Sequence, residues 1–310
     1  MKKLSIVTAV YYNEGSLRFH ADTLAALRNR LRAELDVDVE LIYVNDGSGD
    51  NSFSVLTEIK QKYPDWITVV SLSKNFGAIP ALRAGVEYIT GDCFTTIAAD
   101  LQDPPELIYN LVSEWKAGSE FTICVRENRD DPFFSTLFSK AFNFLARKLI
   151  ISNYPKGGYD LFLIDKKYFG YLKNRGKHFY LQLYCYWLGV KPKVIYYTRR
   201  KREHGKSRWT FRKKMKLMVD SFVGFSSAPI HFVSLLGIGT STISFLYGIY
   251  MLFNAITGHI IVPGFATIIC ILSFLLGLII FMLGIVGEYL ARIYDEVNHK
   301  PEYVIEKVIL

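Results

Sequence analysis

Residues 221–287 read SFVGFSSAPIHFVSLLGIGTSTISFLYGIYMLFNAITGHIIVPGFATIICILSFLLGLIIFMLGIVG, and none of these 67 residues is Asp, Glu, Lys or Arg. A helix needs roughly 20 apolar residues to cross the hydrocarbon of a bilayer. The stretch therefore holds two crossings, predicted at 228–253 and 262–287, joined by a short turn at 254–261. The alternative is a helical hairpin buried in a soluble core, which does not need so long a run without charge.

Basic residues gather immediately before this stretch. The chain has a net charge of +8, and residues 199–216, RRKREHGKSRWTFRKKMK, contain ten Lys or Arg and one Glu, a net charge of +9. The remaining residues sum to −1 (8 − 9), which argues against a nucleic-acid-binding protein and indicates one local anionic partner. Beside a membrane segment, lipid phosphate is the natural candidate for that partner.

The flanks of the two predicted crossings set their orientation. The turn at 254–261 has no Lys or Arg, whereas the basic stretch precedes the crossings and Arg292 and Lys300 follow them. The positive-inside rule then predicts a multi-pass protein in the lipid bilayer of the cell membrane, with its first domain and both termini in the cytoplasm.

Three further helices are expected outside the two predicted crossings. Residues 211–227 predict a juxtamembrane amphipathic helix, and residues 288–310 a cytoplasmic helix with a tail. Segment 133–151 combines a polar stripe with a strongly aromatic face, and both a core helix and a helix in the membrane interface fit it. Tyr289, Ile293 and Val297 form an apolar stripe on the last helix. This stripe suits self-association into a homo-oligomer, whose size the sequence does not give.

Residues 1–210 have the pattern of a soluble α/β domain. Strands are expected at 4–10, 39–45, 67–71, 93–98 and 120–125, and helices near 16–34, 52–63, 78–89 and 105–117. The alternation of nearly continuous apolar strands with helices predicts a mostly parallel sheet covered on both faces. The first apolar run is too short for a signal peptide. The four cysteines are scattered without a C-x-x-C pair, which suits a reducing cytosol.

Polar side chains follow each of the first four predicted strands. Because ligands bind beyond the carboxyl ends of parallel strands, these side chains predict a nucleotide site. Asp46 is expected to accept hydrogen bonds from a base or ribose, and Lys74 with Asn75 to face a diphosphate. Taken alone, each motif is also typical of an ordinary capped turn. The full set predicted to bind a nucleotide sugar is Tyr12, Asn13, Glu14, Asp46, Lys74, Asn75, Gly77 and Asp100.

The turn after the fourth strand, IAADLQDPPE at 97–106, carries the most specific signal. Asp100, Gln102 and Asp103 place oxygen ligands in one short, proline-stiffened turn. Hard oxygen donors suit Mg²⁺ or Mn²⁺ held jointly with a nucleotide diphosphate. An acidic helix start that complements the helix dipole accounts for Asp103, but not for polar motifs at four successive strand ends.

Seven motifs follow one another along the chain: VTAVYYNE, VNDGSGDNS, LSKNFGAIPAL, AADLQDPPE, GGYDLFLIDKK, RKREHGKSRW and GEYLARIYDEV. As an ordered set they resemble the family 2 glycosyltransferases that load sugars onto polyprenyl phosphates. This group includes dolichyl-phosphate mannose synthases and bactoprenol glucosyltransferases. The resemblance runs from end to end. It implies a GT-A fold (Rossmann-like, with a mostly parallel sheet), a nucleotide-sugar donor, a divalent metal and a polyprenyl phosphate acceptor.

The resemblance also implies roles for single residues. Asp160 in GGYD matches the proposed catalytic base. The family's D-x-D-x-Q metal motif matches at Asp100 and Gln102, but its first Asp is Ala98 here, and Asp103 is the candidate to compensate. Attraction to lipid headgroups is an alternative role for the basic residues. The residues expected to hold the acceptor phosphate are Arg126, by a looser match, and Arg199, Arg202, Lys206 and Ser207.

The predicted function is that of a membrane-bound inverting glycosyltransferase, which moves a sugar from a nucleotide sugar to a polyprenyl phosphate. Glucose is the favoured sugar and UDP-glucose the favoured donor. The second pKa of a phosphate monoester is near 6, so the acceptor is largely deprotonated at pH 7 and Asp160 is expected mainly to position it. Ala98 favours an alternative, a catalytically weakened nucleotide-sugar-binding scaffold. A processive polysaccharide synthase is disfavoured by the two crossings and by the missing Gln of Q-x-x-R-W before Arg208-Trp209.

Overall fold

The computed structural model describes residues 1–126, 142–155, 158–173, 180–198, 211–257, 264–298 and 300–310. They form two compact units. One contains residues 1–217 together with 301–310, and the other contains residues 218–300. The last ten residues, expected to be a tail, therefore return to the first unit.

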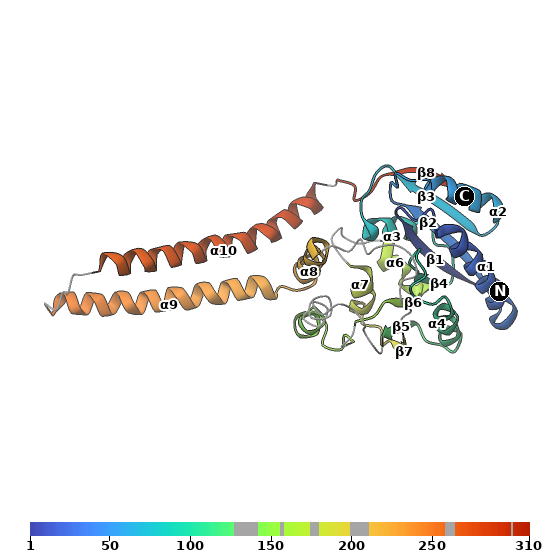
Figure 1. Ribbon diagram of the computed structural model, residues 1–310. Coiled ribbons are helices and arrows are strands. Elements are labelled where there is room, and N and C mark those ends of the chain that lie inside the picture. The colour runs from blue at the N-terminus through green and yellow to red at the C-terminus, as the bar shows by residue number, and fades with distance from the viewer. Residues whose placement is uncertain (127–141, 156–157, 174–179, 199–210, 258–263, 299) are drawn as a thin grey trace. The chain divides into compact units, whose positions relative to one another are not determined.

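An eight-stranded sheet organises the first unit (Figure 1). Its strands lie in the order β7-β5-β6-β4-β1-β2-β3-β8. β6 runs antiparallel to β4 and β5, β8 runs antiparallel to β3, and the other neighbours are parallel. The predicted α/β fold with a mostly parallel sheet is confirmed. The strands are β1 Lys2–Val10, β2 Val37–Asn45, β3 Ile67–Leu72, β4 Cys93–Thr96, β5 Phe121–Arg126, β6 Leu161–Asp165, β7 Lys193–Tyr197 and β8 Ile305–Ile309.

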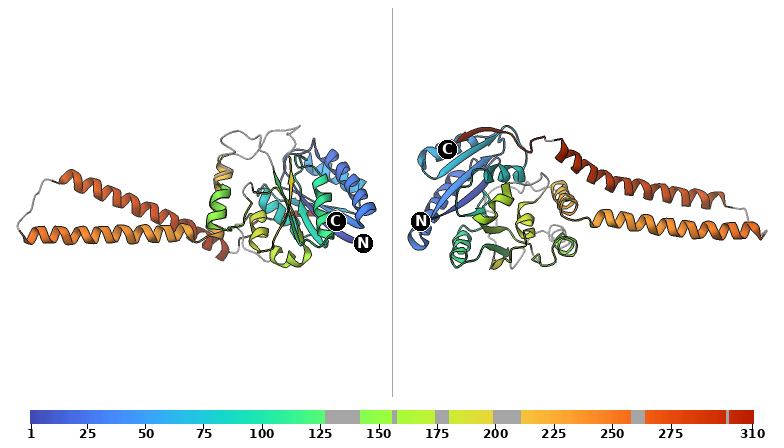
Figure 2. Two further views of the ribbon diagram at one scale, coloured as in Figure 1. Left: turned by 90° about the horizontal axis from the view of Figure 1, so that it is seen from below. Right: turned by 180° about the vertical axis from the view of Figure 1, so that it is seen from behind.

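Helices cover both faces of this sheet (Figures 1 and 2). α1, α2 and α4 share a core with Leu4, Ile6 and Tyr43 on one face. α3 packs on β1 and β2 at the other face. α6 joins that second face where Phe169 meets Phe94, with ring centroids 6.3 Å apart. The helices are α1 Leu17–Leu35, α2 Ser52–Lys62, α3 Ala78–Val86, α4 Glu106–Lys116, α6 Phe169–Lys173 and α7 Leu181–Trp187, with a 3₁₀ turn, η1, at Lys166–Tyr168.

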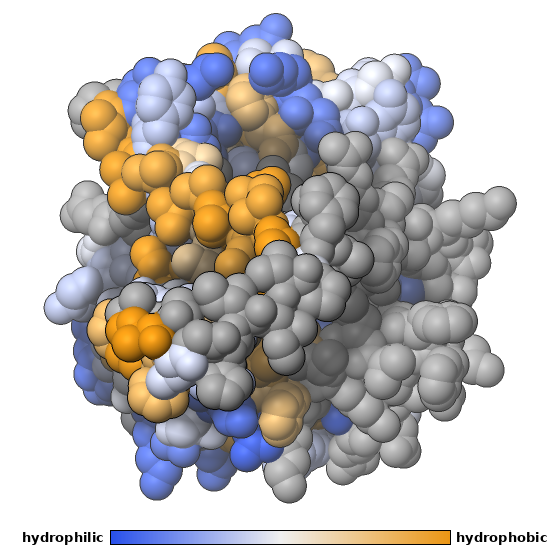
Figure 3. Space-filling model, turned by 90° about the vertical axis from the view of Figure 1, so that its left-hand side faces the viewer, coloured by the Kyte–Doolittle hydropathy of each residue, from blue (hydrophilic) through white to orange (hydrophobic). Residues whose placement is uncertain are grey.

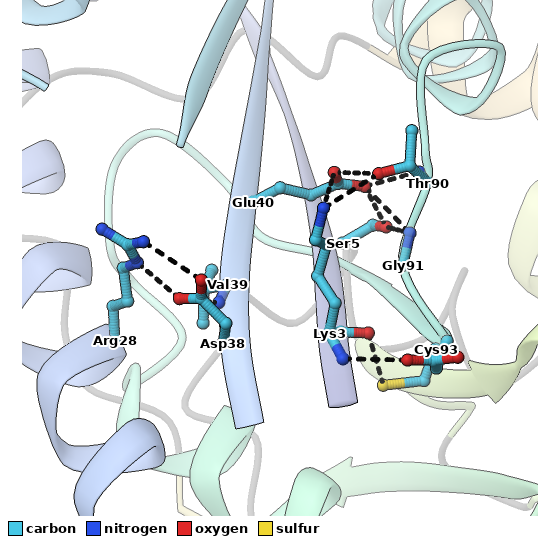
Figure 4. A network of polar contacts seen from close by, with 10 residues as sticks. Lys3, Ser5, Arg28, Asp38, Val39, Glu40, Thr90, Gly91 and Cys93 are labelled. Atoms are coloured by element: carbon cyan, nitrogen blue, oxygen red, sulfur yellow. Dashed lines mark hydrogen bonds and ion pairs between the residues drawn. The ribbon is translucent and has the colours of Figure 1, made fainter. Parts of the chain in front are cut away.

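A polar network joins the amino-terminal halves of β1 and β2 to the residues before β4 (Figure 4). The Glu40 carboxylate accepts hydrogen bonds from Ser5 Oγ at 2.5 Å and from the N–H groups of Thr90 and Gly91 at 2.6 and 3.1 Å. Lys3 Nζ lies 3.6 Å from the same carboxylate. This network satisfies the polar groups at one end of the sheet, opposite the strand ends that carry the predicted site.

The second unit contains two long apolar helices, α9 Ala228–Ile256 and α10 Phe265–Val297, after α8 Phe211–Phe225, which begins in the first unit. The segments Ala228–Met251 and Ile271–Val297 are long and apolar enough to cross a membrane. Large apolar side chains such as Phe245 and Phe274 are exposed along them, and orange side chains gather on these helices in Figure 3. The second predicted crossing and the helix expected after it are continuous, because α10 runs without a break from Phe265 to Val297. At 1.5 Å per residue, its 33 residues extend about 50 Å.

Two polar contacts fix the end of α10 within the second unit. Arg292 Nη2 lies 2.8 Å from Asp220 Oδ1, and the Tyr289 hydroxyl donates to the Ser226 carbonyl at 3.0 Å. Tyr289 of the predicted association stripe is therefore engaged inside its own chain. Ile293 and Val297 of that stripe are exposed, and self-association stays a prediction.

The segment predicted at 133–151 is described only from residue 142, and residues 142–149 are helical. The two described residues of the polar stripe face inward, since Asn143 is 4% exposed and Arg147 Nε is buried. Phe144 on the aromatic face is 62% exposed. The described part of this helix therefore packs through its polar and small side chains.

Candidate active site

The carboxyl ends of β1 to β5 and β7 meet at one edge of the sheet, where loops carry most of the predicted site residues. β6 is antiparallel to its neighbours, so it presents its amino end at this same edge. This reversal explains why Asp160, which precedes a strand, lies with residues that follow strands. The edge is where ligands of parallel α/β sheets bind.

Asp46 joins the loop after β2 to the loop after β3. Its carboxylate is 2% exposed and accepts hydrogen bonds from the N–H groups of Phe76 at 2.7 Å and Gly77 at 2.9 Å. It also accepts a bond from Asn75 Nδ2 at 3.0 Å. Asp46 thus holds the loop that carries Lys74 and Asn75. Its predicted contact with a base or ribose stays a prediction.

The same two loops touch at Gly47, which has a φ of +61°. A Cβ at this position would lie 2.6 Å from the backbone nitrogen of Asn75. We expect Gly47→Ala to lower the free energy of unfolding by about 3 kcal/mol, because a left-handed alanine adds to a backbone clash. Thermal unfolding of the detergent-solubilised chain measures this loss.

Gly189→Ala is the matched control for Gly47→Ala. Gly189 has a φ of +80°, but a Cβ there has no neighbour within 4 Å among the described atoms. The control therefore carries only the left-handed backbone cost of about 1 kcal/mol. Equal losses in the two variants would contradict the packing of Gly47 against the β3–α3 loop.

The loop after β1 places Tyr12, Asn13 and Glu14 beside the β2 loop. Glu14 Oε2 accepts the N–H of Asn51 at 2.9 Å, at the start of α2, and Asn13 donates its N–H to Ser52 Oγ at 3.0 Å. Tyr12 is 43% exposed with a φ of +56°. Left-handed non-glycine residues cost free energy and gather at functional sites. The described residues include three left-handed residues other than glycine, and two of them, Tyr12 and Leu101, lie in loops at this edge of the sheet.

The turn after β4 separates the three predicted metal ligands into two environments. Asp100 and Gln102 are half-buried, and Asp100 Oδ1 accepts the N–H of Gln102 at 3.3 Å. Asp103 is 6% exposed, and its Oδ1 accepts the hydroxyl of Tyr197 at 2.9 Å. Asp103 is thus engaged with the far side of the sheet edge, at β7.

The side chains of this turn fit a divalent cation that a diphosphate helps to hold. Within the described part of the chain, no cluster of three His, Cys, Asp or Glu side chains is close enough to bind a metal ion. Mg²⁺ is commonly bound by one or two carboxylates together with substrate phosphates and water. Asp100, with Gln102 beside it, would hold such an ion, and the ion would neutralise charge on the leaving diphosphate.

Asp160 is the centre of a polar cluster drawn from four elements. Arg126, at the end of β5, donates to both oxygens of Asp160, from Nη2 to Oδ1 at 2.7 Å and from Nε to Oδ2. The hydroxyl of Tyr197, at the end of β7, lies 2.9 Å from Asp160 Oδ2 as well as 2.9 Å from Asp103 Oδ1. Arg126 and Tyr197 are register partners on neighbouring strands, which aims both at Asp160.

Burial and charge keep the two donors of this cluster, the Tyr197 hydroxyl and the Arg126 guanidinium, protonated. Burial, then the carboxylates of Asp160 and Asp103, raises the pKa of Tyr197 well above its ordinary value. Burial alone would lower the pKa of Arg126, but the adjacent Asp160 carboxylate raises it. A hydroxyl carries one proton, so Tyr197 donates to one carboxylate at a time. Its hydroxyl lies 2.9 Å from a carboxylate oxygen of each aspartate, which links the acidic turn to Asp160.

His20 of α1 lies under the acidic turn, fully buried, with Nδ1 2.7 Å from the Tyr43 hydroxyl. Burial lowers the pKa of His20 to about 4, against an opposite effect of the Asp100 carboxylate. An unfolded histidine titrates near pH 6.5, so between these values the unfolded state binds more protons. The stability that neutral His20 contributes is therefore full above about pH 6.5 and is lost as the pH falls toward 4.

We expect acidification from pH 7.5 to pH 5 to lower the free energy of unfolding by about 2 kcal/mol more in the natural chain than in His20→Gln. Glutamine cannot titrate but still offers hydrogen-bonding atoms to Tyr43. Denaturant unfolding of both proteins at the two pH values measures the difference, since titrations shared by both cancel. Parallel losses would show that His20 does not titrate as a buried neutral group.

Comparison with known proteins identifies the class of this site. The family model described as glycosyl transferase family 2 matches residues 5–175, more than half of the chain. The chain belongs to glycosyl transferase family 2. The matched residues include the loops after β1 to β5 and Asp160 before β6. The strand-edge site is therefore the candidate active site of a glycosyltransferase with a GT-A fold.

Relatives of this glycosyltransferase match it along nearly its whole length. The uncharacterized glycosyltransferase YkcC of Bacillus subtilis is 32% identical over 98% of this chain and 93% of its own. The SfII prophage-derived bactoprenol glucosyl transferase of Shigella flexneri is 28% identical over 98% of both chains. Among solved structures, a mannosyl-3-phosphoglycerate synthase from Rubrobacter xylanophilus is similar over 71% of each chain, with 17% identity and a TM-score of 0.46.

The structure adds residues to the glycosyltransferase site that sequence reasoning did not select. Tyr197 is the main one, and its signal was its place at a strand end directly before the basic stretch. His20 is the other, and nothing in its helical pattern distinguishes it from a core residue. The predicted phosphate ligands Arg199, Arg202, Lys206 and Ser207 lie outside the described residues.

Proposed function

We propose that this glycosyltransferase transfers glucose from UDP-glucose to the phosphate of a polyprenyl phosphate, with inversion at the anomeric carbon. The observation that carries the proposal is the extent of the similarity to bactoprenol glucosyl transferases. It covers 98% of the chain, so it includes both candidate membrane spans as well as the family domain. A lipid acceptor accounts for joining a nucleotide-sugar site to a membrane hairpin.

The donor is proposed to lie across the loops after β1 to β4. Lys74 and Asn75 are exposed in a loop that Asp46 holds, which suits contact with a diphosphate. Asp100, with Gln102, would hold Mg²⁺ or Mn²⁺ at that diphosphate, and Asp103 would support the turn through Tyr197. These roles follow from the position of each side chain at the carboxyl edge of the sheet.

The acceptor phosphate is proposed to approach the Asp160 cluster. The phosphate oxygen attacks the anomeric carbon from one side while the nucleoside diphosphate leaves from the other, which inverts the configuration. Asp160 accepts two N–H bonds from Arg126, which fixes the plane of its guanidinium. Arg126 in this orientation binds the phosphate dianion by charge-assisted hydrogen bonds. Asp160 then acts chiefly by fixing Arg126 and Tyr197.

The catalytic unit and both termini are proposed to lie on the cytoplasmic side of the membrane. β8 follows both candidate spans in the chain, yet it pairs with β3 in the same sheet. The chain must therefore cross the membrane an even number of times between residues 217 and 301, as two spans do. The basic residues before the first span favour the cytoplasmic side.

The direct test measures transfer of label from radioactive UDP-glucose to undecaprenyl phosphate in detergent. Mg²⁺ or Mn²⁺ is added first, and EDTA afterwards. Metal-dependent label in the lipid phase is the expected result. If label reached the lipid only from another UDP-sugar or a GDP-sugar, the proposed donor would be wrong, but the proposed type of reaction would stand. Anomeric configuration of the product, read by NMR against that of the donor, tests inversion.

One observation favours a second function, a nucleotide-sugar-binding scaffold with weakened catalysis. Ala98 stands where the family's first metal-binding Asp is expected, and it is exposed. Binding of UDP without transfer from any donor, with all lipids and metals present, would support the scaffold. Turnover in the presence of metal would eliminate it.

A further inference from the structure

The last residues of the chain form an outer strand beside the proposed donor site. β8 pairs antiparallel with β3, with Val69 opposite Ile309 and Leu72 opposite Ile305 (Figure 1). The register shifts between Ser71 and Leu72, so the pairing is irregular just before the β3–α3 loop begins. Such bulges bend a strand and redirect the residues after it.

The contact continues from the strand into the loop itself. The N–H of Ser73 donates to the Val304 carbonyl at 3.0 Å. Ser73 directly precedes Lys74 and Asn75, which are proposed to face the donor diphosphate. The C-terminal segment therefore fixes the first residue of this loop by a backbone hydrogen bond.

The helix that follows the loop is held by an ion pair with little exposure to solvent. Arg83 of α3 is 4% exposed, and its Nη1 pairs with Oε1 of Glu302, whose side chain is 18% exposed. α3 begins at Ala78, directly after the loop, so Glu302 holds the helix into which the loop leads. Removing one partner of a buried pair leaves a charge without compensation, which makes such pairs sensitive to substitution.

We propose that residues 302–304, directly before β8, are a positioning element of the donor-nucleotide site. They hold the β3–α3 loop at Ser73 and the following helix α3 at Arg83, while Asp46 holds the same loop from β2 through Phe76 and Gly77. The loop is thus fixed between two parts of the chain that lie more than two hundred residues apart in sequence. This inference rests on the proposed function, because it assumes that the loop binds the donor.

The test compares Glu302→Gln with Glu306→Gln in the full-length protein in detergent. Glu306 is exposed on β8, outside residues 302–304, so the second variant makes the same chemical change without touching Arg83. We expect Glu302→Gln to weaken UDP binding, measured by calorimetry, by about tenfold, the size of loss seen when support behind binding residues is removed. Its KM for the donor should rise in parallel, with the KM for the lipid acceptor unchanged. Glu306→Gln should match the natural chain.

Two further results separate positioning from general stabilisation. Arg83→Gln should weaken UDP binding as much as Glu302→Gln, and the double variant should be no worse than either, because both changes break one pair. A lower unfolding temperature of Glu302→Gln with unchanged UDP affinity would overturn the inference and leave β8 as an edge strand that only stabilises. If the natural chain binds neither UDP nor GDP, the proposed function fails and this inference fails with it.

Discussion

Replacing Asp160 with asparagine is expected to lower the rate of sugar transfer by about a hundredfold, the cost of misplacing a reacting group by about 1 Å. Asp160 accepts two bonds from Arg126 and one contact from Tyr197, and asparagine offers one acceptor oxygen and no charge. The half-buried guanidinium of Arg126 then loses its counter-charge and its orientation toward the acceptor. Initial rates at saturating donor and varied acceptor measure the loss.

The pH dependence of this loss identifies the role of Asp160. The acceptor phosphate loses its second proton near pH 6, so a deficit caused by a missing base should shrink as the pH rises well above that value. We expect instead a deficit that is constant between pH 6.5 and 9. Tyr197→Phe, which keeps both carboxylates, should show part of the same constant deficit. Asp65→Asn, an exposed substitution before β3, is the control and should leave the rate unchanged. Recovery of Asp160→Asn at high pH would establish the base role.

Asp100→Asn is expected to abolish Mn²⁺ binding by the nucleotide-loaded protein and to lower the transfer rate by on the order of a hundredfold to a thousandfold. The described residues contain no cluster of three acidic, His or Cys ligands, so we expect a single carboxylate and the diphosphate to share the ion. Titration of Mn²⁺ with and without UDP, followed by electron paramagnetic resonance, reports binding independently of turnover. In the natural chain, tight binding should appear only with UDP.

Two matched variants test this shared site. Ala98→Asp restores the carboxylate that the family motif predicts, at an exposed position, and should strengthen Mn²⁺ binding. Asp65→Asn should change neither metal binding nor rate. Tight Mn²⁺ binding without nucleotide in the natural chain would contradict the shared site. So would undiminished binding by Asp100→Asn in the presence of UDP.

The first five strands and four helices follow from local sequence patterns, because each is a continuous apolar run or a helical stripe. β1 and β2 begin two residues before their predicted starts and end where predicted. β6, β7 and β8 were not predicted. β8 contains Glu306 and Lys307 in a short edge strand, and such strands carry little periodic signal. Only pairing with β3 reveals it.

The candidate site was predictable as a set of loops but not as a set of contacts. The motifs placed Asp46 and Asp100 at one sheet edge, since parallel strands end together, whereas Asp160 was selected only through the family resemblance. Which carboxylate is buried depends on side-chain partners far away in sequence. Tyr197 engages Asp103 across 94 residues and Asp160 across 37. Two residues assigned separate roles, Arg126 and Asp160, proved to be one ion pair.

The pairing of β8 with β3 also sets the order in which the parts of the protein fold during synthesis. Residues 301–310 leave the ribosome after both candidate spans, so until then the outer edge of β3 exposes unpaired N–H and C=O groups. In the proposed topology, the sheet is completed once both candidate spans have entered the bilayer with their outer ends on one side. In that topology, a chain that crossed the bilayer only once would leave β8 across the membrane from β3, and the edge of β3 would stay open to other strands. The final strand thus makes completion of the sheet depend on correct insertion.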